Sequence, residues 1–137
     1  MLVVLDTNVL ISAILGEFSL PGRVLEAWYH RKFTLLSSME QIEEVGRVSG
    51  YPHLAPRLPA SKVGRLINDL REVATNVTNL PLLDISTDPF DNYLLAMAQK
   101  GKANFLVTGD KADLLGLDKF SAAKIIAVRQ FARILEL

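Results

Sequence analysis

The sequence has no cysteine and only two histidines among its 137 residues. The lack of cysteine excludes disulfide bonds, thiolate zinc sites and a thiol nucleophile. An excess of charge is also missing, because 15 basic and 15 acidic residues give a formal net charge of zero. Without a general cationic surface, any contact with a phosphate backbone has to be local or to act through bound metal.

Long apolar runs are absent too, and the N-terminus lacks the basic start and cleavage region of a signal peptide. We therefore expect a cytoplasmic protein without a membrane segment. Half of the residues are hydrophobic, which is enough for a sizeable core at this length. The chain is expected to form a single domain that spans residues 1–137.

The first stretch that suggests chemistry lies at the N-terminus. Leu2 to Leu5 form a short apolar run that predicts a strand buried on both faces, and Asp6-Thr7-Asn8 follows it directly. A carboxylate at the end of such a strand lies at the edge of the sheet where open α/β folds bind ligands. The triplet is also a good cap for a helix predicted over residues 9–15, and on the triplet alone both interpretations stay open. If Asp6 serves chemistry, Thr7 and Asn8 are left to do the capping.

Strands and helices are predicted to alternate along the rest of the chain. Further strands are expected at residues 33–36, 77–85, 104–108 and 124–128, and the strand at 77–85 is expected to be irregular because of Pro81. Helices are expected from Pro21-Gly22 onward and at residues 39–49, 60–76, 89–101 and 129–135. This alternation predicts a three-layer α/β/α fold with a central, mainly parallel sheet of four to five strands and right-handed crossovers.

Three aspartates are predicted to meet at one edge of this sheet. Asp6 follows the first strand and Asp110 follows the fourth, so both face one crevice if these strands are neighbours. Asp88-Pro-Phe-Asp91 begins a helix, and Asp91 in its first turn points toward the same edge. The tetrapeptide also resembles a capping box, an interpretation that we favour more for Asp88 than for Asp91.

Several carboxylates at one edge repel one another unless a cation neutralises them or their pKa values rise. A set of oxygen ligands without cysteine or a well-placed histidine suits a hard ion such as Mg²⁺ or Mn²⁺. Such ions activate water and neutralise charge on a phosphate during phosphoryl chemistry. The pattern therefore indicates a metal-dependent site.

Four motifs, taken together, resemble those of the PIN-domain nucleases, and most closely the toxin-like (VapC-like) PIN proteins of prokaryotic toxin–antitoxin systems. They are Asp6-Thr7-Asn8, Ser38 with Glu44 six residues later, Asp88-Pro-Phe-Asp91-Asn92 and Thr108-Gly109-Asp110. Their order and the length of the chain carry the resemblance, which covers nearly the whole sequence. It implies a catalytic metal site formed by Asp6, Glu44, Asp91 and Asp110, with Asn8 and Thr108 in support through hydrogen bonds.

The resemblance also implies an activity and partners. These are a metal-dependent endoribonuclease that uses Mg²⁺ or Mn²⁺, an RNA substrate, a small cognate antitoxin protein and a homodimer. Asp88 and Asp113 are expected to act as loop or helix caps, with Asp113 assisting Asp110. From spacing alone Glu40 or Glu43 could replace Glu44, although Glu44 flanks the buried stripe of its helix.

Two other functions remain open from the sequence. One is a non-catalytic PIN-like module that binds RNA or protein, which the four retained acidic residues disfavour. The other is a phosphoacceptor receiver domain, which usually has a pair of acids after its first strand. Leu5-Asp6-Thr7 lacks such a pair.

Overall fold

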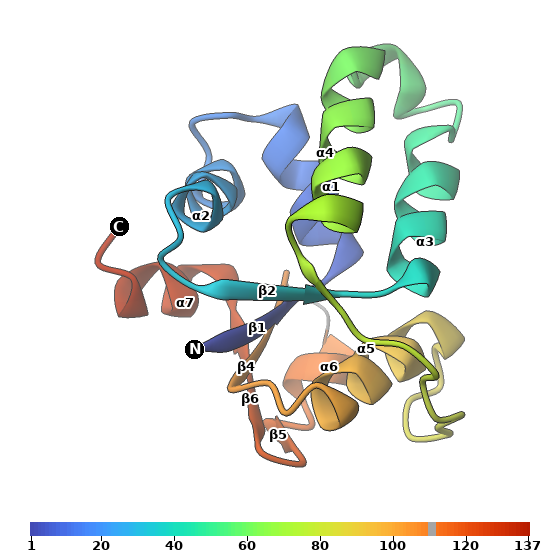
Figure 1. The fold of residues 1–137 in the computed structure, drawn as a ribbon, viewed down its shortest axis with the longest axis vertical. Helices are drawn as coiled ribbons and strands as arrows, with labels where there is room; N and C mark the ends of the chain where they lie inside the picture. Colours follow the sequence, from blue (N-terminus) through green and yellow to red (C-terminus); the bar gives the residue numbers. More distant parts are fainter. Residues whose placement is uncertain (110–111) are drawn as a thin grey trace.

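The chain forms a three-layer α/β/α fold around one mostly parallel sheet (Figure 1). The structure is a computed structural model that describes residues 1–109 and 112–137, without the side chains of residues 112 and 113. The strand order is β3-β2-β1-β4-β6-β5, and only the β5–β6 pair is antiparallel. The strands are β1 (Leu2–Leu5), β2 (Thr34–Ser37), β3 (Thr75–Asn76), β4 (Phe105–Thr108), β5 (Lys119–Phe120) and β6 (Ala123–Ala127).

The predicted fold class is confirmed, with six strands where four to five were expected. The difference comes from the two-residue strands β3 and β5 at the sheet edges, which are too short to leave a periodic pattern in the sequence. The helices are α1 (Thr7–Leu15), α2 (Leu20–Tyr29), α3 (Met39–Ser49), the 3₁₀ turn η1 (Ala55–Arg57), α4 (Ala60–Glu72), α5 (Pro89–Lys100), α6 (Ala112–Leu115) and α7 (Val128–Ile134).

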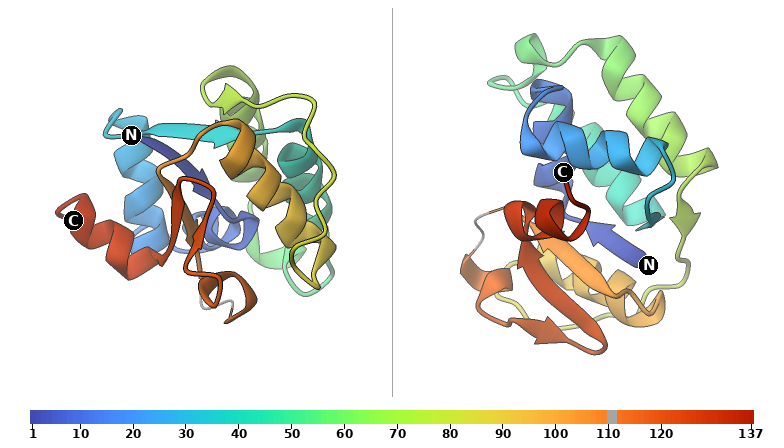
Figure 2. Two further views of the ribbon diagram at one scale, coloured as in Figure 1. Left: turned by 90° about the horizontal axis from the view of Figure 1, so that it is seen from below. Right: turned by 90° about the vertical axis from the view of Figure 1, so that its left-hand side faces the viewer.

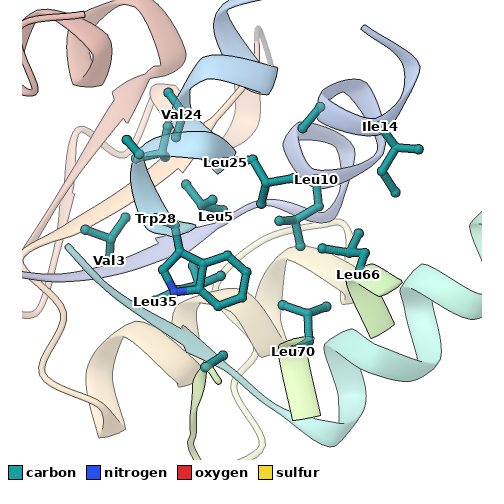
Figure 3. Packing of buried hydrophobic residues seen from close by; sticks show 14 of the residues in the cluster. Val3, Leu5, Leu10, Ile14, Val24, Leu25, Trp28, Leu35, Leu66 and Leu70 are labelled. Atoms are coloured by element: carbon teal, nitrogen blue, oxygen red, sulfur yellow. The ribbon is translucent and has the colours of Figure 1, made fainter. Parts of the chain in front are cut away.

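Helices cover both faces of the sheet, and the sheet divides the core into two hydrophobic clusters. Helices α1 to α4 and α7 lie on one face, and α5 and α6 lie on the other (Figures 1 and 2). The residues of β1 are all apolar because both faces of this strand are buried. Val3 and Leu5 belong to the first cluster, whereas Val4 belongs to the second. Figure 3 shows the first cluster, in which Trp28 packs among leucines from α1, α4 and the sheet.

Two predicted boundaries were wrong. Helix α1 begins at Thr7 and not at residue 9, because Asp6 itself is the N-cap. Helix α4 ends at Glu72 and not at residue 76. The strand predicted at residues 77–85 was also wrong, because this segment contains no strand and the two-residue strand β3 lies just before it. Past the end of α4 the Asn76 side-chain amide donates to the carbonyls of Leu70, Arg71 and Ala74, and so provides partners for backbone groups at and just beyond the helix end.

No single helix in the described ranges is long and apolar enough to cross a membrane. Helices α1 and α2 together have the length and apolar composition of a membrane span, but the chain bends by 99° between them.

A buried glutamine fixes the position of α3 on the sheet. Ser38 caps this helix by accepting a hydrogen bond from the Gln41 backbone N–H at 3.2 Å. The Gln41 side-chain amide donates to the Leu5 carbonyl at 2.7 Å, and its oxygen accepts from the Ser37 hydroxyl at 2.8 Å. Gln41 is fully buried, so one side chain links β1, β2 and α3.

Replacing this glutamine by leucine is expected to destabilise the protein. Gln41→Leu keeps a side chain of similar size but removes the partners of the Leu5 carbonyl and the Ser37 hydroxyl, at a cost of about 1–3 kcal/mol in the free energy of unfolding. Urea denaturation measures this loss. The matched control is Glu43→Leu at an exposed position of the same helix, expected to change stability by less than about 0.5 kcal/mol. Equal stabilities of the two variants would contradict this role of Gln41.

Candidate active site

Asp6 combines the two roles that the sequence left open. It directly follows β1, is 1% exposed, and caps α1 by accepting a hydrogen bond from the Asn8 N–H on Oδ1 at 3.1 Å. Its other oxygen, Oδ2, accepts a hydrogen bond from Thr108 Oγ1 at 2.9 Å. Strands β1 and β4 are paired with Leu5 opposite Val107, so Thr108 lies at the end of the neighbouring strand. The carboxylate is therefore held at the carboxyl edge of the sheet.

Helix α3 presents one of its three glutamates to the same edge. The side chain of Glu44 is 10% exposed, whereas Glu40 and Glu43 are exposed on the solvent side of the helix. Glu44 Oε1 accepts a hydrogen bond from the Tyr93 hydroxyl at 2.5 Å, and Oε2 lies 3.5 Å from the Arg47 guanidinium. The structure thus separates Glu44 from the two residues that spacing alone left as alternatives.

Asp91 lies in the first turn of α5 and is 1% exposed. Asp88 is the N-cap of this helix and accepts a hydrogen bond from the Phe90 N–H at 2.9 Å. The Asp88 N–H donates to Ser86 Oγ at 3.2 Å, and the Ser86 hydroxyl lies 3.4 Å from Asp91 Oδ2. Ser86 therefore stands between the two groups that a capping box would join directly.

The segment before α5 is fastened to it by Asn92. The Asn92 side-chain oxygen accepts hydrogen bonds from the N–H groups of Ile85 and Ser86, at 3.1 and 2.8 Å, and its amide donates to the Ser86 carbonyl at 3.1 Å. These three bonds hold Ser86 beside Asp91. The asparagine in the Asp91-Asn92 motif is thus a positioning group and not part of the acidic set.

Tyr93 is the site residue that sequence reasoning missed. Its hydroxyl lies 3.0 Å from Thr7 Oγ1 and donates to Glu44, so it joins α5 to α1 and α3. Burial, followed by the charge and hydrogen bond of Glu44, raises the pKa of the Tyr93 phenol far above its ordinary value of 10.0; the nearby Asp6 charge acts in the same direction. The phenol therefore stays a neutral hydrogen-bond donor among carboxylates. The available signal was its position two residues after Asp91, but its helical spacing with Phe90 and Met97 placed it in the apolar stripe.

Several predicted site residues lie outside this geometry. Asp110 falls outside the described residues, as does the side chain of Asp113. Asn8 is exposed at the rim, where it and Glu44 line the same surface hollow. Within the ranges that the structure describes, no three His, Cys, Asp or Glu residues converge closely enough to hold a metal ion. The ionisable groups that are buried at this edge are carboxylates, a donor set that suits a hard divalent cation.

The raised pKa of Tyr93 predicts how its contribution to stability depends on pH. Because the folded protein keeps this phenol protonated, the unfolded chain alone loses the proton above pH 10, and stability falls there. Wild type is expected to be more stable than Tyr93→Phe at pH 8, and this advantage should shrink by about 1.4 kcal/mol per pH unit above pH 10. Urea denaturation between pH 8 and 11 measures it. A difference between the two proteins that stays constant over this range would contradict the prediction.

Comparison with known proteins agrees with this fold. Residues 2–112 match the PIN domain family. The chain is also similar to an uncharacterized protein of Methanocaldococcus jannaschii, with 28% identity over 120 residues that cover 84% of this chain and 74% of that protein. PIN domains are generally nucleases and typically use divalent metals. With the family match extending from the first strand to the start of α6, this chain belongs to the PIN domain family and has its nuclease-type fold.

Proposed function

We propose that this protein is a metal-dependent endoribonuclease that hydrolyses RNA phosphodiester bonds. One observation carries the proposal: Asp6 and Glu44, from different elements, come together around a phenol that stays protonated, at the carboxyl edge of a nuclease-type fold. Asp91 lies at the start of the helix that carries this phenol. Asp110 directly follows Thr108-Gly109 in the sequence and would complete the acidic set.

Asp6, Glu44, Asp91 and Asp110 are the residues that would hold Mg²⁺ or Mn²⁺. A bound ion of this kind lowers the pKa of a water and neutralises charge on the phosphate that the water attacks. The protein holds the ligands in place: Thr108 and the Asn8 N–H fix the two oxygens of Asp6, and Tyr93 fixes one oxygen of Glu44. Each of these donors is neutral, so the carboxylates keep the negative charge that attracts a cation. One carboxylate of the set accepts the proton that the attacking water loses.

The proposal is tested by RNA cleavage with a matched pair of variants on one helix. Wild type should cleave single-stranded RNA with Mg²⁺ or Mn²⁺ and not with EDTA. Glu44→Gln, Asp6→Asn and Asp110→Asn should each lose at least about 10-fold in rate. Loss of a residue that only orients a metal ligand already costs about 10- to 100-fold, and loss of the ligand itself should cost no less. Glu43→Gln, at an exposed position next to Glu44, should cleave like wild type.

Circular dichroism and thermal unfolding check that the variants remain folded. Equal cleavage by wild type and the three site variants after careful purification would overturn the nuclease proposal. RNA binding without cleavage by any protein of the series would indicate the alternative, a non-catalytic PIN-like module.

The biological role that we propose is that of a toxin controlled by a small cognate antitoxin protein, with the chain acting as a homodimer. This part rests on the resemblance to toxin-like PIN proteins. An antitoxin that covers the acidic edge would block both the metal ligands and the approach of RNA, and so would inhibit without unfolding the enzyme.

Induced expression in a bacterial host tests the toxin role. Wild type is expected to arrest growth, and Asp6→Asn, expressed to the same level, is expected to leave growth unchanged because the ligand set is broken. Light scattering of the purified protein tests the homodimer separately. Normal growth with wild-type protein that cleaves RNA in vitro would contradict the toxin role while leaving the nuclease proposal intact.

A further inference from the structure

An exposed cluster of flat side chains lies directly beside the acidic edge. It consists of Arg47 and Tyr51 at the end of α3, His53 in the following loop and Phe90 in the first turn of α5, and we call it the aromatic platform. The Arg47 guanidinium lies over the Phe90 ring at 4.4 Å from its centroid and 5.8 Å from that of Tyr51. The Tyr51 and His53 rings stack with centroids 6.0 Å apart and an interplanar angle of 28°. Arg47 also donates a hydrogen bond to the Tyr51 hydroxyl, which orders the cluster.

The aromatic platform shares a surface hollow of about 270 Å³ with Glu44, one of the acids proposed to hold metal. The four platform residues line it together with Glu44, Asn8 and Asp88. Glu44 is bound to Tyr93 and lies next to Arg47, so it forms the boundary between the acidic edge and the platform. The flat side chains therefore lie beside Glu44, where a substrate bound at the acidic edge can reach them.

The exposure of Phe90 contrasts with that of its neighbour. Phe90 is 46% exposed, whereas Asp91, the next residue, is 1% exposed. The helix thus buries an acid at its start and leaves a phenylalanine ring about half exposed where it lines the hollow. The exposed part of a ring that already contacts a guanidinium can pack against one more flat group.

We propose that the aromatic platform stacks an unpaired base of a single-stranded RNA substrate beside the phosphate that is cleaved. This inference rests on the proposed nuclease function and adds to it a binding site for one base of the substrate. Aromatic rings and arginine planes are the common binding surfaces for bases that have left a duplex. Stacking also suits a chain with zero net charge, because binding then depends less on a broadly cationic surface. Arg47 contributes a planar face and a positive charge at a place where the neighbouring side chains Glu44 and Asp88 are acidic.

Binding of two labelled oligonucleotides tests the proposal with the full-length protein. One is hexa-adenylate RNA, and the other is a hexamer with the same sugar-phosphate backbone and no bases. Fluorescence anisotropy in EDTA and low salt measures Kd without cleavage. Wild type should bind hexa-adenylate more tightly than the abasic hexamer, and Phe90→Ala should weaken binding of hexa-adenylate roughly 5- to 150-fold while leaving that of the abasic hexamer unchanged.

Two further variants separate stacking from other effects. Phe18→Ala removes a phenylalanine that is 90% exposed between α1 and α2 and lines a different hollow, and it should bind both oligonucleotides like wild type. Arg47→Lys keeps the charge but loses the planar face, so it should weaken binding of hexa-adenylate more than that of the abasic hexamer.

The proposal is overturned if wild type does not distinguish the two oligonucleotides, whether it binds both or neither. It is also overturned if Phe90→Ala weakens both equally, which would place the contact on the backbone, or weakens neither, which would leave the surface to a protein partner. These outcomes are independent of cleavage. Loss of base-dependent binding in a protein that cleaves RNA rejects the platform alone, whereas base-dependent binding without cleavage in Mg²⁺ or Mn²⁺ rejects the nuclease proposal alone.

Discussion

The rest of the site depends on the pairing of β1 with β4, which brings Thr108 close enough to donate a hydrogen bond to Asp6. This hydrogen bond joins the ends of β1 and β4, two parallel neighbours from distant parts of the sequence. The chain extends the sheet from β1 toward β2 and β3 on one side and from β4 toward β6 and β5 on the other. The crevice at such a switch point is where open α/β sheets carry their ligands. A shift in this pairing would move Asp6 and Thr108 apart, and with them the α1 cap that Asp6 provides.

Hydroxyl groups contact three of the described carboxylates at the acidic edge. Thr108 binds Asp6, Tyr93 binds Glu44, and Ser86 lies beside Asp91, while Arg47 reaches Glu44 only at 3.5 Å. A hydroxyl that donates to a carboxylate fixes its orientation without cancelling its charge. Burial keeps the Tyr93 phenol protonated, so its donor role persists at any ordinary pH. The geometry is therefore set while the affinity for a divalent cation is retained.

Helices α3 and α5 both contribute to the acidic edge and to the aromatic platform, through side-chain contacts between them at the edge of the sheet. Each helix contributes an inward acid, Glu44 or Asp91, and an outward flat group, Arg47 or Phe90. On α3 the two residues are one turn apart, and on α5 they are adjacent, so the Glu44–Tyr93 and Arg47–Phe90 contacts join the two helices side by side at the edge of the sheet. The acidic edge and the aromatic platform are therefore adjacent, because the same two helices contribute to both.

The sequence by itself determined the fold class, the strand that carries Asp6 and the start of α3 and α5, because buried strands, caps and helical spacing are local signals. It also indicated four acids in an order typical of a PIN domain. Only the tertiary structure separated Glu44 from Glu40 and Glu43, showed that Asp6 both caps α1 and accepts from Thr108, and brought in Tyr93. It likewise added the edge strands β3 and β5. The contacts of Glu44, Thr108 and Tyr93 join residues far apart in the chain, and strands of two residues are too short for a periodic pattern, so local signals in the sequence predict neither.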